Sequence, residues 1–140
     1  AGANFAVTDL SITHTLADSS NKLILLGTIG TLAAGNNVLQ VGMAFADDGT
    51  RIAVGDADGT RTRVTVGQRN EGTASNVLST FASSQVVYEP GDTASHTYTL
   101  RGVNLGGATD TVYINRRPND LNDPATPRGA SSLVLMEVKV

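Results

Sequence analysis

The feature that most constrains the fold is an alternating segment from Val38 to Ala46. Its larger apolar residues recur at every second position; they are Leu39, Val41, Met43 and Phe45. Because successive side chains of a β-strand point to opposite faces, this period of two predicts a strand with one core face. No long stretch has apolar positions at helical spacing, and threonine and valine are abundant. The sequence therefore predicts an all-β protein.

Turn signals follow this segment at short intervals. Asp48-Gly49 and Asp58-Gly59 each join two runs of strand-forming residues, and Asp-Gly favours hairpin turns because glycine adopts positive φ without steric cost. We expect strands at Arg51–Val54 and Arg61–Val66, with the arginines of the second run on its exposed side. Short strands between turn signals are typical of a sandwich or jelly roll rather than of βαβ units.

The second half of the chain holds a predicted hairpin and a predicted loop. Glu89-Pro90-Gly91-Asp92 suits a type II turn, which should connect Gln85–Tyr88 with Ser95–Leu100 as a hairpin. The segment from Arg116 to Gly129 contains three prolines and several Asn and Asp residues, so it cannot pair in the interior of a sheet. It is predicted to be a long loop, and loops of this length in compact domains are often functional.

Size, charge and cysteine content exclude several classes of protein. One domain spanning residues 1–140 is expected, because the chain has an ordinary single-domain length and no linker divides it. The absence of cysteine excludes disulfides and thiolate metal sites. The net charge is -3 with no basic stripe, so nucleic acid is not an expected partner. The most apolar stretch, Leu23 to Ala34, is too short to span a bilayer. The first residues do not form a signal peptide, and we expect a complete gene product.

Two predicted strands are apolar on both faces, which indicates an oligomer. In Lys22–Ile29 and in Leu133–Met136, apolar residues occupy both the odd and the even positions, and therefore both faces of the strand. A sandwich strand of a monomer should instead show a polar outer face. A partner subunit would cover the second face, since soluble monomers rarely expose large apolar areas. The alternative is that loops or the N-terminal segment cover it within one subunit. The predicted subunit-interface residues are Leu23, Leu25, Leu133 and Leu135.

Candidate catalytic groups are few. His14 and His96 each lie in an alternating run without a nearby carboxylate that local strand geometry would bring close, so both are interpreted as ordinary sheet histidines. No Gly-x-Ser-x-Gly motif is present, and the chain has no tryptophan for a sugar-stacking platform. The sequence therefore predicts neither an enzyme nor a lectin, although a small β-fold hydrolase or lectin stays open as a rival class.

Four aspartates on the two Asp-Gly turns could form a weak calcium site if the turns lie side by side. They are Asp47, Asp48, Asp56 and Asp58. The spacing lacks the third acidic position and the downstream glutamate of a calcium-binding loop, and hairpin turns explain these residues better. No metal and no cofactor is predicted.

Arginines bracket the proline-rich loop. Arg116 and Arg117 precede it and Arg128 follows it, so these side chains could bind an acidic neighbour through bidentate contacts. Two solvated loop ends are an equally good interpretation.

Several segments taken together resemble a group of tailed-bacteriophage virion proteins. They are Asp18 to Leu25, with the sequence Asp-Ser-Ser-Asn-Lys-Leu-Ile-Leu, then Tyr98-Thr99-Leu100, then Thr111 to Arg116 and Ser131 to Val138. The proteins of this group are small tumour-necrosis-factor-like jelly rolls, found as capsid decoration (cement) proteins and as tail-fibre domains. The resemblance covers the start and the last third of the chain, and the middle matches only in its turns and strand spacing.

This resemblance implies an antiparallel jelly-roll sandwich that forms a homotrimer, with its first and last strands neighbouring each other in the inner sheet. A chain of this length has no room for the stalk and anchor of a fibre, so a capsid decoration protein is expected, with a tail-fibre or receptor-binding domain as the alternative. The implied partner is the major capsid protein, and the implied location is the capsid surface of the virion, without membrane or nucleic acid. The residues predicted to contact the capsid are Asn4, Phe5, Arg116, Arg117 and Arg128.

Overall fold

The fold is known from a computed structural model, which describes residues 4–34, 38–71, 79–105, 111–116, 122–124 and 128–140. The described residues form strands and irregular segments without a helix, and every pairing between strands is antiparallel. The strands are β1 (Asn4–Thr15), β2 (Lys22–Ala34), β3 (Val38–Asp47), β4 (Thr50–Ile52), β5 (Val66–Glu71), β6 (Ser79–Tyr88), β7 (Ser95–Asn104), β8 (Val112–Ile114) and β9 (Ser132–Val138). The prediction of an all-β protein is confirmed.

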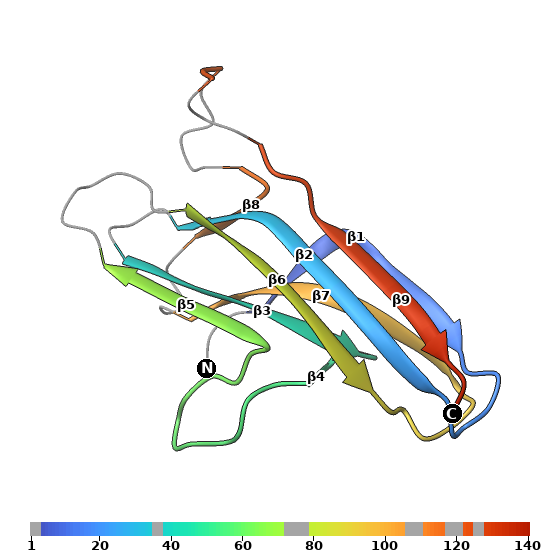
Figure 1. Cartoon of the computed structure of the whole chain (residues 1–140). Helices are drawn as coiled ribbons and strands as arrows, with labels where there is room; N and C mark the ends of the chain where they lie inside the picture. Colours follow the sequence, from blue (N-terminus) through green and yellow to red (C-terminus); the bar gives the residue numbers. More distant parts are fainter. Residues whose placement is uncertain (1–3, 35–37, 72–78, 106–110, 117–121, 125–127) are drawn as a thin grey trace.

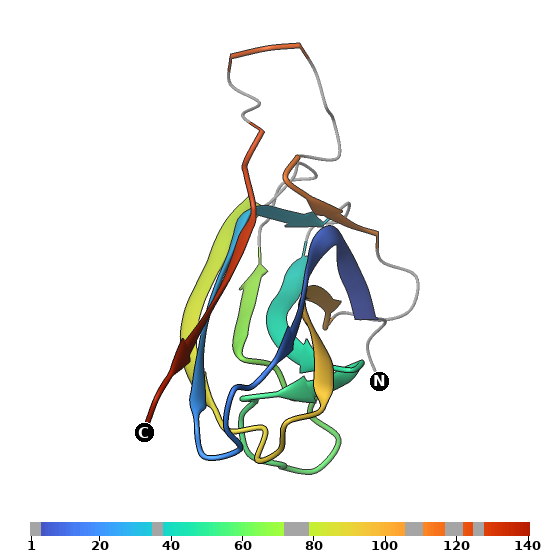
Figure 2. The same ribbon diagram turned by 90° about the vertical axis from the view of Figure 1, so that its right-hand side faces the viewer.

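Two antiparallel sheets face each other as a β-sandwich (Figures 1 and 2). One sheet has the order β1-β7-β3-β4. Strand β4 pairs with the end of β3, and β5 pairs with the earlier part of β3, from Val38 to Met43. The other has the order β6-β2-β8, and β9 pairs with β2 along the rest of its length. Strand β2 therefore lies at the centre of the second sheet, with β6 on one side and β8 and β9 on the other.

The core fills the space between the sheets. Many of its fully buried side chains are the inward-facing residues of three strands, β2, β3 and β7. Among them are Leu23, Leu25, Ile29, Met43, Phe45, Tyr98 and Leu100. Burying each such side chain stabilises the fold by roughly 1.5–3 kcal/mol. The alternation predicted for Val38–Ala46 is confirmed at Val41, Met43 and Phe45, which belong to this core.

Gly27 allows the two sheets to approach closely at the middle of β2. A Cβ atom at this position would lie 2.7 Å from Leu100 Cδ1 and 2.8 Å from Phe45 Cε1 on the opposite sheet. Close packing of this kind leaves no space for even one additional methyl group. The glycine that interrupts the apolar run of β2 is therefore explained by the packing of Phe45 and Leu100.

The Asp48-Gly49 hairpin is confirmed, because it joins β3 to β4 with Gly49 at a φ of 88°. The strand expected at Arg61–Val66 is wrong, since β5 begins only at Val66. Arg61 instead pairs with Asp58 at 2.5 Å. Arg63 donates from Nε to the carbonyl oxygen of Gly55, and the backbone N–H of Thr65 donates to the carbonyl oxygen of Met43 in β3, so arginine contacts and isolated backbone hydrogen bonds hold this segment in place of a regular strand.

The hairpin expected around Glu89–Asp92 is also wrong in its pairing. Gly91 has a φ of 82°, as a type II turn requires, but the turn carries the chain from β6 in one sheet to β7 in the other. Similarly, the first and last strands do not pair with each other: β1 pairs with β7 and β9 pairs with β2. The expected adjacency of first and last strands within one sheet is therefore not found.

No helix in the described part of the chain is long and apolar enough to span a membrane.

Candidate functional site

One candidate interaction surface is the outer face of the sheet formed by β6, β2 and β9. Strand β9 alternates in exposure, so that Val134 and Met136 are 46% and 44% exposed while Leu133 and Leu135 turn inward. In the register of the sheet, Met136 lies beside Ile24 of β2, and Val134 lies beside Leu26. These outward side chains form a continuous apolar row across two strands.

The third strand of this sheet extends the same surface. Val87 of β6 pairs with Ile24 from the other side and is 59% exposed, and Phe81 near the start of β6 is 73% exposed. We call Ile24, Leu26, Val87, Val134 and Met136 the outer apolar face. An antiparallel sheet that faces water normally carries polar residues at these positions, so the composition of this face marks it as a surface for contact.

The predicted subunit-interface residues lie on the opposite parity and are corrected. Leu23 and Leu25 are fully buried inside the single chain, and Leu133 and Leu135 pack against the same core. A side chain that fills the core of one subunit is not available to a partner. Strands β2 and β9 do carry apolar residues on both faces, as expected. The face that the single chain leaves uncovered is the one with Ile24 and Met136.

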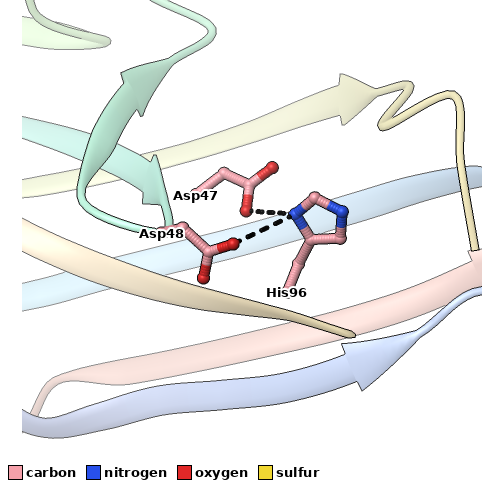
Figure 3. A group of neighbouring side chains, drawn as sticks. All are labelled: Asp47, Asp48 and His96. Atoms are coloured by element: carbon pink, nitrogen blue, oxygen red, sulfur yellow. Dashed lines mark hydrogen bonds and ion pairs between the residues drawn. The ribbon is translucent and has the colours of Figure 1, made fainter. Parts of the chain in front are cut away.

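A second candidate site lies where β3 ends and β7 begins. Asp47 is the last residue of β3, Asp48 is the first residue of the following turn, and His96 is the second residue of β7. Figure 3 shows both carboxylates approaching the same ring nitrogen. His96 Nδ1 is 2.8 Å from Asp47 Oδ1 and 3.4 Å from Asp48 Oδ2. We call these three residues the Asp-His cluster.

Each member of the Asp-His cluster also has a hydrogen-bond partner outside the cluster. The hydroxyl of Tyr88 donates to Asp47 Oδ2 at 2.9 Å, and the backbone N–H of Thr97 donates to Asp48 Oδ1 at 2.9 Å. His96 Nε2 lies 3.0 Å from Asp92 Oδ1. Burial, followed by the hydrogen bond to Asp47, raises the pKa of Tyr88 to about 12, so this hydroxyl remains a donor.

The charge state of His96 follows from its neighbours. Both ring nitrogens face carboxylate oxygens, which only accept hydrogen bonds, so the geometry favours the doubly protonated imidazolium. The hydrogen bond to Asp92, followed by the one to Asp47, raises the pKa of His96 above its ordinary value of 6.5. The hydrogen bond to His96 in turn lowers the pKa of Asp92. The cluster is an ionic contact that ties the β3–β4 turn to β7.

This raised pKa predicts the pH dependence of stability. Protonation of His96 stabilises the folded state fully below the unfolded pKa of about 6.5, and that contribution is lost as the pH rises through the higher folded pKa. The unfolding temperature of the wild type should therefore fall as the pH rises above about 6.5. A His96→Gln variant should lack this fall, and thermal unfolding followed by circular dichroism measures both. An equal slope in the two proteins would contradict the assignment.

The sequence did not connect these residues, because Asp47 and His96 are 49 positions apart. Of the four aspartates considered for a calcium site, Asp47 and Asp48 lie together in one cluster. Asp56 and Asp58 are exposed in the segment after β4 and are not part of the cluster. The interpretation of His96 as an ordinary sheet histidine is therefore replaced by membership of a charged cluster.

The other histidine also has a carboxylate partner from a distant strand. His14 Nε2 of β1 is 2.8 Å from Glu137 Oε2 of β9, and the backbone N–H of Ala17 donates to Glu137 Oε1 at 2.9 Å. The hydrogen bonds from Asn21 and Ala17 lower the pKa of Glu137. This contact links the edges of the two sheets, so it has a structural explanation without a ligand.

The residues predicted to contact the capsid are only partly described. Asn4 and Phe5 begin β1, where they pair with Val103 and Gly102 of β7, and Arg117 lies outside the described residues. Arg116 is exposed, with its guanidinium 5.1 Å from the ring centre of Tyr113, and Arg128 is exposed just before β9. Arg116 thus follows β8 and Arg128 precedes β9, whose start lies at the end of the sandwich opposite to the C-terminus (Figure 1).

Comparison with protein families, with curated proteins and with solved structures found no match for this chain.

Proposed function

We propose that the chain is a bacteriophage virion protein, a capsid decoration protein that binds the outer surface of the shell as a homotrimer and stabilises it. The outer apolar face carries this proposal, because it is a sheet surface that one subunit leaves uncovered and that a second copy can cover. Two of the segments that resemble phage virion proteins, Asp18–Leu25 and Ser131–Val138, contain the start of β2 and all of β9, which form part of this face.

The subunit contact is proposed to form where the outer apolar faces of three copies meet around one threefold axis, so that each face contacts both neighbouring copies. Burial of Val134 and Met136 with their β2 neighbours would remove apolar area from water. Val134 and Met136 are 46% and 44% exposed, so covering each contributes about half of the roughly 1.5–3 kcal/mol that full burial of an exposed side chain gives. Closed symmetry would then leave no apolar face exposed. The antiparallel sandwich supports this arrangement through β2 and β9, which pair with each other, and a jelly-roll connectivity of the strands remains part of the proposal.

The capsid contact is proposed to use the end of the sandwich where β9 starts (Figure 1). Arg116 follows β8 and Arg128 precedes β9, and arginine forms bidentate contacts with carboxylates of a partner. Asn4 and Phe5 are the proposed second contact. A trimer would present three such ends at once, so several weak contacts would add as avidity. A ligand that binds only the assembled shell stabilises that shell by mass action.

Copy number tests this role against the alternative of a tail-fibre or receptor-binding domain. Purified protein is added to undecorated capsids of candidate tailed phages, the particles are separated by sedimentation, and bound protein per particle is quantified. Saturation at many copies per particle, together with a higher temperature of capsid disruption, is the expected result. Saturation at a few copies confined to the tail would favour the fibre role.

A further inference from the structure

We propose that the Asp-His cluster is a binding site for one divalent transition-metal ion of the Zn²⁺ class, ligated by Asp47 Oδ1, Asp48 Oδ2 and His96 Nδ1. The three candidate ligand atoms come from the end of β3, the adjoining turn and the start of β7, and all lie within 4.8 Å of one another. This site is independent of the virion role and of the outer apolar face.

The spacing of the ligand atoms fits a metal ion with short bonds. Zn²⁺ binds imidazole nitrogen and carboxylate oxygen at about 2.0–2.2 Å, which separates neighbouring ligands in a tetrahedral site by roughly 3.4 Å. His96 Nδ1 and Asp48 Oδ2 are 3.4 Å apart. His96 Nδ1 and Asp47 Oδ1 are 2.8 Å apart, so these two atoms have to separate by roughly 0.6 Å to reach the tetrahedral spacing when the ion replaces the hydrogen bond between them. Three protein ligands leave a fourth position for water.

The groups behind the ligands support the same interpretation. A metal-binding histidine usually donates its second ring N–H to a carboxylate, and ligating carboxylates are themselves hydrogen-bonded. His96 Nε2 faces Asp92 Oδ1 at 3.0 Å, which leaves Nδ1 as the ligating atom. Tyr88 holds the far oxygen of Asp47, and the N–H of Thr97 holds the far oxygen of Asp48. Every ligand is therefore oriented by a separate partner while its other polar atom points into the cluster.

The ligand set selects the class of metal. Ca²⁺ and Mg²⁺ prefer six or more oxygen ligands, whereas imidazole suits Zn²⁺ and its neighbours in the transition series. The Asp47 side chain is 9% exposed and the His96 side chain 17%, while the Asp48 side chain is 59% exposed, so the site has one open side for entry of the ion. Binding would replace the proton on His96 Nδ1, which passes to the solvent.

Calorimetric titration of the metal-free full chain with ZnCl₂ in phosphate-free buffer at neutral pH tests the site. We expect one saturable Zn²⁺ per chain, a rise in unfolding temperature, and binding of CaCl₂ at least tenfold weaker. Asp48→Asn should weaken Zn²⁺ binding at least tenfold. This variant should fold normally, because Asn tolerates the φ of 43° at this position and keeps the oxygen that accepts from Thr97. Asp56→Asn, at an exposed turn position, is the matched control and should bind as the wild type does.

Nitrogen NMR of the histidine rings adds a readout specific to the proposed ligand atom. Zn²⁺ should shift the Nδ1 resonance of His96 and leave both ring nitrogens of His14 unchanged. Absence of saturable Zn²⁺ binding, equal affinity in Asp48→Asn and wild type, or a shift at His14 without a shift at His96 would each overturn the proposal.

Discussion

Replacement of Met136 by glutamate is expected to convert the proposed trimer into a folded monomer. Met136 is 44% exposed at the centre of the outer apolar face, between the flanking positions of β9 and next to Ile24 of β2. In a single subunit the new carboxylate would be solvated, so the free energy of unfolding should change by less than about 1 kcal/mol. In a subunit interface the same carboxylate would lose its water without a partner, which costs several kcal/mol.

The predicted size of this effect is at least a hundredfold weaker association. Sedimentation equilibrium of wild type and Met136→Glu over a range of concentrations measures it, and circular dichroism checks that both are folded. Thr60→Glu, an exposed position outside the face, is the matched charge control and should remain trimeric. A Met136→Glu protein that associates as tightly as the wild type would exclude this face as the interface.

Replacement of Asp47 by alanine is expected to produce the largest loss of stability outside the apolar core. Asp47 is 8% exposed and accepts from Tyr88 while it pairs with His96. Its removal leaves the Tyr88 hydroxyl without its acceptor and removes the nearest of three carboxylates around His96, which should reduce the free energy of unfolding by about 2–3 kcal/mol. Urea unfolding of the two proteins measures the difference.

Two further variants separate this explanation from a general effect of losing an aspartate. Asp56→Ala, in the exposed segment after β4, should change the free energy of unfolding by less than about 0.5 kcal/mol. The double variant Tyr88→Phe with Asp47→Ala should lose less free energy of unfolding than the two single variants together. In the double variant the Tyr88 hydroxyl, which Asp47→Ala alone leaves without an acceptor, is absent. A cost below about 1 kcal/mol for Asp47→Ala would contradict the importance assigned to the cluster.

Local patterns predicted the strands more reliably than the partners of those strands. The period of two in Val38–Ala46 places Met43 and Phe45 in the core, and the Asp48-Gly49 turn forms the predicted hairpin. The turn at Gly91 also has the backbone conformation that its sequence requires. Whether the strands on either side of a turn share a sheet depends on distant contacts, however, and here they lie in different sheets.

The two candidate sites show the same limit. Strands β2 and β9 are apolar on both parities, so the sequence alone could not say which parity faces the core, and the four interface leucines were assigned to the wrong side. Glu137 lies on the same side of β9 as Leu133 and Leu135. Its charge is met by His14 and Ala17 at the sheet edge. The Asp-His cluster joins Asp47 and Asp48 to a histidine from a distant strand, which no local spacing signals. The contact of His96 with Asp92, four positions earlier, is local, so the expectation that His96 has no nearby carboxylate is wrong.

The central claim is that this chain forms a trimer that binds phage capsids, and the mass of the purified protein in solution tests it most directly. Light scattering coupled to size exclusion is run on the protein alone and after mixing with undecorated particles. The account predicts three times the mass of one 14.5 kDa chain, followed by disappearance of that peak into the particle peak. A monomer at all concentrations that remains separate from the particles would contradict both the proposed interface and the proposed role.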